Sequence, residues 1–240
     1  MAQYDSFAAF YDAVNGEPTE LIATLLGAFD RYRPDARNVL ELGCGTGAVL
    51  AGLGSGYSLT GIDLSSRMLE RAQRRCPEAR LLEADITRFE LDETFDAVIC
   101  VFDTLNHVTS LEGWETVVSK VAQHLRDGGL FLFDLNTVGR LRDLGDMAPW
   151  VYDFDGHTLV MDVDFSRAPL AVWDIRIFEH RSDDSYVLHR DTIFELGVDL
   201  ETVRQMLSAH FEILEEFDEE GSPATDDSVR AIVVARRRPR

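Results

Sequence analysis

The sequence predicts an α/β fold: an open, largely parallel β-sheet with helices on both faces, interrupted by a smaller antiparallel sheet. Over residues 38–134, apolar runs of strand length alternate with helical patterns, which is typical of parallel strands joined by right-handed crossovers. Three glycines follow the run at 39–42, where a tight strand-to-helix turn needs residues without a Cβ. From Trp150 the polarity partly alternates and turn residues recur, which indicates antiparallel strands.

Helices and strands alternate along the first part of the chain. Pro18 is well placed to begin a helix, whose apolar residues recur at helical spacing until Pro34 stops it. Ser65 is expected to cap a second helix, and the turn at 127–129 is expected to end a third that carries Trp114. Strands covered on both faces are apolar throughout, so the five expected strands are the runs at 38–42, 59–63, 80–83, 95–101 and 129–134.

The second half of the chain predicts a lid and then a return to the main sheet. Turn signals at 155–156, 168–169 and 182–185 lie within a region that we interpret as a three-stranded antiparallel sheet. Asp199 then caps a helix, and two strands follow at 211–217 and 229–235. The predicted organisation is an N-terminal helical cap at 1–34, a core at 35–137 and 197–240, and an inserted antiparallel lid at 138–196.

Composition excludes several classes of partner. Acidic residues exceed basic ones by 43 to 23, so the formal charge of −20 repels a polyanion at long range and no nucleic-acid partner is expected. No apolar run reaches the ~18 residues of a membrane helix, and the opening residues do not resemble an export signal. The three cysteines lack the paired spacing of a zinc or redox motif, so we expect reduced thiols, a cytoplasmic protein and no metal site.

The glycines and a later acid predict a nucleoside site. Ligands of open α/β sheets bind beyond the carboxyl ends of the strands, where Gly43, Gly45 and Gly47 fall. Without a Cβ, these residues let a ligand lie against the backbone. Asp63 ends the next strand, 18 positions after Gly45, where its carboxylate can accept hydrogen bonds from ribose hydroxyls.

Five segments in order resemble the class I S-adenosylmethionine-dependent methyltransferases over nearly the whole chain. Glu41 precedes the glycines in the pattern E-x-G-x-G-x-G. The segments are VLELGCGTG (39–47), GID (61–63), EADITRF (83–89), FDAVICVFDTLNH (95–107) and LRDGGLFLFD (125–134). The resemblance implies a Rossmann-like sheet of seven strands, the last one antiparallel, and S-adenosyl-L-methionine as the cofactor.

The same resemblance implies which residues hold the cofactor. Asp63 would bind the ribose, Asp85 with Ile86 would flank the adenine, and the glycine loop would pack against the methionine and ribose portion. The full expected set is Tyr11, Glu41, Gly43, Gly45, Gly47, Asp63, Leu64, Asp85, Ile86 and Phe102.

The opening residues resemble a narrower group, the small-molecule methyltransferases that begin F-A-x-x-Y-D and carry an antiparallel lid after the fifth strand. Here the motif is FAAFYD at 7–12. Some members of this group methylate amino sugars, so the resemblance implies transfer to a nitrogen or oxygen of a small metabolite. Phe7 and Tyr11 would cover the cofactor or line the substrate channel, whereas the lid sequence matches no single substrate class.

One histidine is placed to take a proton. Methyl transfer from a sulfonium is an in-line displacement, and an amine or hydroxyl nucleophile must also lose a proton. His107 follows the fourth strand and is the candidate base, with Asp103 to orient it or to receive a substrate amine. A capping or substrate-remote histidine is the alternative. The candidates for the substrate pocket wall are Asn136, Trp150 and Tyr152, and a homodimer is the assembly to test.

Two other functions fit the glycine motif. A nicotinamide-dependent oxidoreductase is the first, because the glycines also satisfy the loose dinucleotide fingerprint. Its short-chain form needs Tyr-x-x-x-Lys, and the only lysine, Lys120, has Thr116 four positions before it. A noncatalytic protein that binds the adenosyl cofactor is the second, since a fold alone does not fix an activity.

Overall fold

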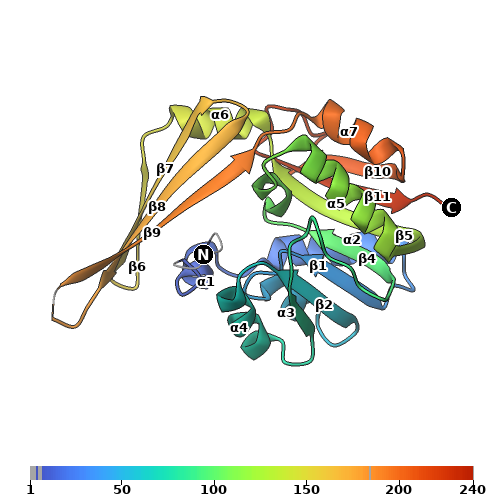
Figure 1. Ribbon diagram of the computed structural model, residues 1–240, viewed down its shortest axis with the longest axis horizontal. Helices are drawn as coiled ribbons and strands as arrows, with labels where there is room; N and C mark the ends of the chain where they lie inside the picture. The colour runs from blue at the N-terminus through green and yellow to red at the C-terminus, as the bar shows by residue number, and fades with distance from the viewer. Residues whose placement is uncertain (1–3, 5–6, 184, 240) are drawn as a thin grey trace.

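The computed structural model describes residues 4, 7–183 and 185–239, which form two sheets joined side by side (Figure 1). The larger sheet has seven strands in the order β10-β11-β5-β4-β1-β2-β3. Its strands are β1 (Asn38–Leu42), β2 (Ser58–Asp63), β3 (Arg80–Glu83), β4 (Phe95–Cys100), β5 (Leu125–Asn136), β10 (Phe211–Asp218) and β11 (Arg230–Arg237). The smaller sheet has four, which are β6 (Trp150–Phe154), β7 (His157–Arg167), β8 (Leu170–His180) and β9 (Tyr186–Leu196).

The larger sheet has the predicted topology. The five strands β1 to β5 pair in parallel, whereas β11 is antiparallel to both β5 and β10. The prediction of seven strands with an antiparallel last one is therefore confirmed. The strand order reverses at β1, which lies between β2 and β4. A ligand crevice is therefore expected at the carboxyl ends of these central strands.

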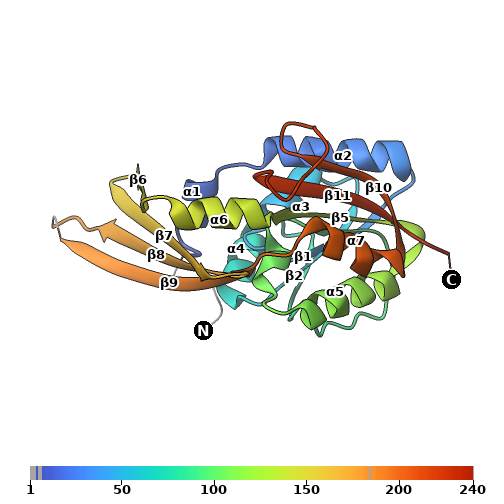
Figure 2. The same cartoon turned by 90° about the horizontal axis from the view of Figure 1, so that it is seen from above.

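Helices cover both faces of the larger sheet (Figure 2). On one face α2 (Thr19–Tyr32) and α3 (Ala48–Leu53) pack on side chains such as Ile99, and on the other α5 (Leu111–His124) and α7 (Leu200–Ser208) pack on side chains such as Val98. Neighbouring residues of β4 thus point into different cores, which explains why residues 97–100 of this strand are all apolar. Between β2 and β3 lies α4 (Ser66–Arg75), capped as predicted by Ser65, whose Oγ accepts the Met68 N–H at 3.3 Å.

The lid is an antiparallel sheet of four strands, so the expectation of three strands was wrong. Asp155 and Gly156 both have left-handed backbone conformations, with φ of 49° and 81°. They make a tight turn that divides residues 150–167 into β6 and β7, which then pair along their length. The helix before them, α6 (Val138–Asp146), packs against β7.

The turn expected at 127–129 does not separate α5 from β5. The helix ends at His124 and β5 begins at Leu125, so the turn residues belong to the strand. Phe95 pairs with Leu125 and Ala97 pairs with Leu130, so the extra residues bulge out of the ladder, and Gly128 takes a φ of 72°. A bulge of this kind uses the same residue types as a turn, which is why the sequence pattern misled.

The N-terminal segment lies between the lid and the glycine loop (43–47). Residues 1–3, 5 and 6 of the predicted cap lie outside the described residues, and α1 (Tyr11–Asn15) follows. The Phe7 N–H donates to the Asp191 carboxylate of β9 at 2.9 Å, and the Asp12 carboxylate accepts the Thr46 hydroxyl at 2.6 Å. The segment therefore contacts both parts of the molecule. In the described part of the chain, no helix has both the length and the apolar character that crossing a membrane requires.

Candidate active site

A cavity of about 700 Å³ lies at the carboxyl ends of the central strands. That volume is within the usual range for sites that bind a cofactor or another small molecule. Its lining comes from the glycine loop, the ends of β1 and β2, the residues after β3 and β4, and α1. Among the residues that line it, those expected from the sequence are Tyr11, Glu41, Gly43, Gly45, Asp63, Leu64, Asp85, Ile86, Phe102 and His107.

The Asp63 carboxylate is fixed in this cavity by backbone groups. Its Oδ2 accepts the Gly45 N–H at 2.8 Å and its Oδ1 accepts the Ser65 N–H at 2.8 Å. Burial raises the pKa of Asp63, and these N–H donors oppose the rise by stabilising the charged form. Each oxygen retains acceptor capacity, so a pair of hydroxyls can bind a carboxylate whose orientation is already set.

The three glycines of the loop have left-handed φ values but different surroundings. At Gly47 (φ 76°) an added Cβ would meet Cys76 Sγ at 2.7 Å, whereas at Gly45 (φ 51°) it would meet nothing within 4 Å. Gly47 is not among the described residues that line the cavity, because it packs against α4 instead. The motif predicts that all three glycines let a ligand approach the backbone. In the structure Gly45 has that role, whereas Gly47 is needed for close packing against α4.

Glu41 presents an unsatisfied buried oxygen to the cavity. The residue is 2% exposed, and its Oε2 has no hydrogen-bond partner among the described residues. Burial, followed by the nearby Asp63, raises the pKa of Glu41. A bound molecule that brings a donor or a positive charge would satisfy this oxygen. The methionine portion of S-adenosylmethionine carries both an ammonium and a sulfonium, so the residues present fit that cofactor.

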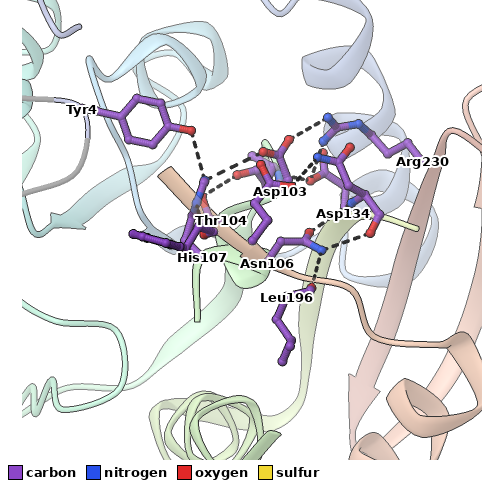
Figure 3. A network of polar contacts seen from close by, with 12 residues as sticks. Tyr4, Asp103, Thr104, Asn106, His107, Asp134, Leu196 and Arg230 are labelled. Atoms are coloured by element: carbon purple, nitrogen blue, oxygen red, sulfur yellow. Dashed lines mark hydrogen bonds and ion pairs between the residues drawn. The ribbon is translucent and has the colours of Figure 1, made fainter. Parts of the chain in front are cut away.

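Beside the cavity lies a polar group that we call the acid cluster. It consists of Asp103, His107, Asp134 and Arg230 (Figure 3), together with Glu195. Arg230 forms ion pairs with Asp103 at 2.7 Å and with Asp134 at 2.9 Å. The Asp134 carboxylate also accepts the Asp103 N–H at 2.7 Å. These contacts hold Asp103 in a left-handed conformation, with φ of 50°, that is rare for a residue other than glycine.

The neighbours of His107 decide which of its nitrogens is basic. Nδ1 lies 3.2 Å from the Phe194 carbonyl oxygen, which can only accept, so Nδ1 carries the hydrogen. Nε2 lies 3.1 Å from the Tyr4 hydroxyl and 3.8 Å from Asp103 Oδ2. Burial lowers the pKa of His107 and raises that of Tyr4, so near neutral pH the phenol donates to a bare Nε2. The available lone pair is therefore the one beside Tyr4, at the cavity wall.

The three substrate-wall candidates lie in different places. Asn136 is 5% exposed and belongs with the acid cluster, because its amide donates to Glu195 Oε2 at 2.9 Å. Trp150 and Tyr152 lie on β6 with their rings stacked 5.5 Å apart, and they are 46% and 38% exposed. Neither aromatic is among the described residues that line the cavity. Their contact with a substrate stays a prediction.

Sequence reasoning did not find Tyr4, Glu195 or Arg230. Asp103 and Arg230 are 127 residues apart and meet because β11 inserts next to β5, so no local motif links them. Glu195 lies near the end of β9, and in the sequence it cannot be told apart from the other polar residues of an alternating strand. The one available signal in the sequence was Arg230, a charged residue at the start of a predicted core strand.

Comparison with known proteins identifies the fold that carries this site. Residues 39–129 match the model of a family described as a methyltransferase domain. Within this range the chain resembles methyltransferase domains. A dTDP-4-amino-2,3,4,6-tetradeoxy-D-glucose N,N-dimethyltransferase of Saccharopolyspora spinosa is 32% identical over 139 residues, which are 53% of each chain. A dTDP-3-amino-3,6-dideoxy-alpha-D-glucopyranose N,N-dimethyltransferase of Streptomyces fradiae is 31% identical over 113 residues, 47% of this chain and 44% of that one. The chain thus spans about half the length of these named relatives.

Similarity over the full length is lower. A putative methyltransferase of a Geobacillus strain is 25% identical over 239 residues, 94% of this chain and 97% of that one. An S-adenosylmethionine-dependent methyltransferase from Clostridium acetobutylicum superposes with a TM-score of 0.88 at 22% identity, over 98% of this chain and 99% of that one. An amino pentose methyltransferase from Micromonospora echinaspora gives 0.80 at 21% identity, over 99% and 98%. Lid and core together therefore have the fold of solved methyltransferases, and the resemblance inferred from the sequence is confirmed.

Proposed function

We propose that this methyltransferase moves a methyl group from S-adenosylmethionine to the nitrogen of an amine carried by a small molecule, with an amino sugar as the favoured substrate class. One observation carries the proposal: a single cavity is lined by Asp63 and Glu41 at the glycine loop and by the neutral imidazole of His107. Groups suited to the cofactor and a group suited to a proton therefore share one space.

In this proposal the chain holds and aligns the two reactants. S-Adenosylmethionine supplies an electrophilic methyl group on a cationic sulfur. Asp63 binds the ribose hydroxyls, Asp85 and Ile86 flank the adenine, and Glu41 lies near the methionine portion. Alignment of a nucleophile at attack distance can lower a barrier by roughly 7–11 kcal/mol, so much of the catalysis comes from positioning.

His107 takes the proton that the nucleophile loses. The Tyr4 hydroxyl contacts Nε2 at 3.1 Å, so the substrate N–H takes over that contact when it binds. Asp103 Oδ2, 3.8 Å from Nε2, stabilises the imidazolium that results. His107 and Asp103 therefore keep the roles predicted from the sequence.

Two considerations favour a nitrogen nucleophile over an anionic or neutral oxygen. In the acid cluster the Asp103 and Asp134 carboxylates share one guanidinium, so the surroundings attract a protonated amine and repel an acid. The dTDP-sugar relatives are named N,N-dimethyltransferases, which favours a nitrogen as the acceptor.

The first experiment tests the cofactor site. Asp63→Ala removes both acceptor oxygens, so we expect the Kd for S-adenosylmethionine to rise at least about tenfold, since a hydrogen bond to a charged group contributes ~1.5–3 kcal/mol. Isothermal titration calorimetry measures it. Asp35→Ala, an exposed acid before β1, is the control and should leave the Kd unchanged. Equal affinities in wild type and Asp63→Ala would remove the ribose contact.

The second experiment tests the reaction. Purified protein with S-adenosylmethionine and a nucleotide-linked amino sugar should yield a product one methyl group heavier by mass spectrometry. The deoxysugar that carries a hydroxyl in place of the amine is the matched control and should not gain mass. Methylation of the hydroxyl compound alone would contradict the nitrogen assignment.

We also propose a cytoplasmic location and a homodimeric assembly. Cys44, Cys76 and Cys100 are all free and buried, as expected for a protein of the reducing cytoplasm. A homodimer is proposed because several large apolar side chains on the lid are exposed, namely Trp150, Val151, Tyr186 and Leu188. Light scattering distinguishes a dimer from the 27.0 kDa monomer.

A further inference from the structure

Glu195 is a buried acid that the proposed reaction does not yet use. It is 2% exposed, near the end of β9, where the lid strand returns to the core. Asn136 donates to its Oε2 at 2.9 Å. One ligand-type atom from each of Asp103, His107 and Glu195 lies within 4.8 Å of the others. Two buried carboxyl groups this close favour either a proton or a cation between them.

The surrounding charges indicate which carboxyl group is ionised. Arg230 is 2.7 Å from Asp103 and 2.9 Å from Asp134, so its positive charge stabilises the ionised form of those two acids. Glu195 instead receives a neutral amide. The charge of Asp103 acts against ionisation of Glu195, and burial raises the pKa of Glu195 well above its usual range. The proton of the pair therefore belongs on Glu195.

The remaining titratable groups do not reverse this conclusion. Tyr4 and Tyr11, from the N-terminal segment, have raised pKa values because they are buried, so both phenols are neutral. His107 is neutral for the same physical reason, since burial lowers its pKa. Asp63, across the cavity, adds negative charge. The cation that faces the pair is the Arg230 guanidinium, which Asp103 shares with Asp134.

We propose that Glu195 is a positioning residue: its protonated carboxyl group donates a hydrogen bond to Asp103 and thereby holds Asp103 beside the His107 base. The inference rests on the proposed function only for the roles of His107 and Asp103. Its consequence is that the lid completes the catalytic group, because Glu195 comes from β9 while Asp103 and His107 come from the segment after β4. Displacement of the lid would leave Asp103 without this donor.

A divalent cation bound by Asp103, His107 and Glu195 is the competing explanation. Arg230 already supplies positive charge to Asp103, and the hydrogen on His107 Nδ1 leaves only the nitrogen that faces Tyr4 for a metal. Neutral imidazole and carboxylate oxygens are nonetheless common ligands, so the test includes metal ions.

Glutamine is the sharpest substitution, because it matches a protonated glutamic acid in shape and can still donate to Asp103. We expect Glu195→Gln to keep kcat within about threefold and to leave the pH dependence of kcat/KM unchanged. Glu195→Ala should lower kcat at least about tenfold, since it removes a donor to a charged acceptor worth ~1.5–3 kcal/mol, with little change in KM for S-adenosylmethionine. The control is Glu179→Gln on β8, whose acid pairs with His189. Equal loss in Glu195→Gln and Glu195→Ala would overturn the proposal.

The proton can also be observed without any turnover. Infrared spectroscopy of the folded protein at neutral pH should show the carbonyl band of a protonated carboxylic acid, shifted in D₂O. Because the pKa of Glu41 is also raised by burial, the band is assigned by difference: it should appear in the wild-type minus Glu195→Gln spectrum and be absent from the wild-type minus Glu179→Gln spectrum. Absence of the band from the wild-type minus Glu195→Gln spectrum would overturn the proposal even if methyl transfer is confirmed, and its presence there would support it even if the substrate class is wrong.

A metal-binding experiment tests the competing explanation. Titration of the purified protein with Zn²⁺ and Mn²⁺, followed by calorimetry, should show no stoichiometric site that depends on Glu195. Binding of one ion that Glu195→Gln abolishes would overturn the proposal in favour of a metal site. If Glu195→Ala does not fold, the glutamine variant and the infrared band carry the test.

Discussion

At the residue scale, the chemistry of His107 is set by neighbours rather than by its type. A carbonyl oxygen at Nδ1 fixes the tautomer, a phenol at Nε2 marks the basic lone pair, and burial favours the neutral ring. These three conditions are what a general base near neutral pH requires. Burial lowers the pKa of His107, and Asp103, the Phe194 carbonyl and Asp63 oppose that effect without cancelling it.

We predict that kcat/KM falls on acidification with a midpoint below pH 6.5. The folded-state pKa of His107 is lowered from 6.5, so the ring stays neutral and active until the pH passes below that folded value. His107→Gln should lower kcat by about 10²–10⁴ and remove this acidic limb, while cofactor binding is retained. Values of kcat/KM measured between pH 5 and pH 9 test this prediction. The control is His210→Gln, at an exposed histidine, which should leave the acidic limb unchanged. An unchanged acidic limb in His107→Gln would assign it to another group.

The lowered pKa of His107 also makes the stability of the fold depend on pH. Because the unfolded chain binds the proton more tightly than the folded one, this histidine contributes a free energy of folding that is lost as the pH falls below about 6.5.

Residues within one motif could be predicted from the sequence, and residues brought together by the fold could not. Glu41 and Asp63 were found because each ends a strand beside the glycines, and both line the cavity. Glu195 and Arg230 were missed because β9 and β11 bring them to Asp103 only through tertiary pairing. The motif shows which strand ends face the cofactor, but it carries no information about what the lid contributes.

At the element scale, the turn from β1 to α3 distinguishes two uses of glycine. We predict that Gly45→Ala costs ~1 kcal/mol of stability, because alanine is strained at φ 51° but meets no atom within 4 Å. Gly47→Ala should cost ~2–4 kcal/mol, because the same strain is joined by contacts of 2.7 Å to Cys76 Sγ and 3.1 Å to the Ala72 Cβ. Urea unfolding of both variants measures the difference. Equal losses would mean that strain alone requires the glycine.

Elements with one dominant signal were also the ones predicted with correct bounds. β1 and β3 begin and end where their apolar runs do, since glycines or turns flank them. The start of β5 was misplaced because its bulge contains Asp127, Gly128 and Gly129, the residues of an ordinary turn. The lid was assigned too few strands because the residues before and after the recognised turn signal at 155–156 were counted as one strand, whereas that turn divides the short edge strand β6 from β7.

At the scale of the whole molecule, the N-terminal segment connects the lid to the cofactor cavity. Phe10 is 7% exposed and packs against the lid residues Phe154, His157 and His189, with ring centroids 5.3–6.1 Å apart. One residue further along, Tyr11 lines the cavity, and Asp12 bonds to Thr46 of the glycine loop. Occupancy of the cavity should therefore be coupled to the order of the lid, since both depend on the same short helix.

This coupling predicts an asymmetric response to Phe10→Ala. Loss of a buried aromatic ring costs ~3–5 kcal/mol of stability. This loss should destabilise the N-terminal segment and the lid, because Phe10 packs with lid residues and not in the two cores of the larger sheet. Hydrogen exchange should show lost protection in α1 and in β7 to β9, unchanged protection in β4, and partial recovery when S-adenosylmethionine binds. Val187→Ala, exposed on the same sheet, is the control and should change none of these. Protection lost equally in β4 would mean that lid and core unfold as one unit. If adding S-adenosylmethionine restored no protection in α1 and the lid, α1 would not transmit the state of the cavity.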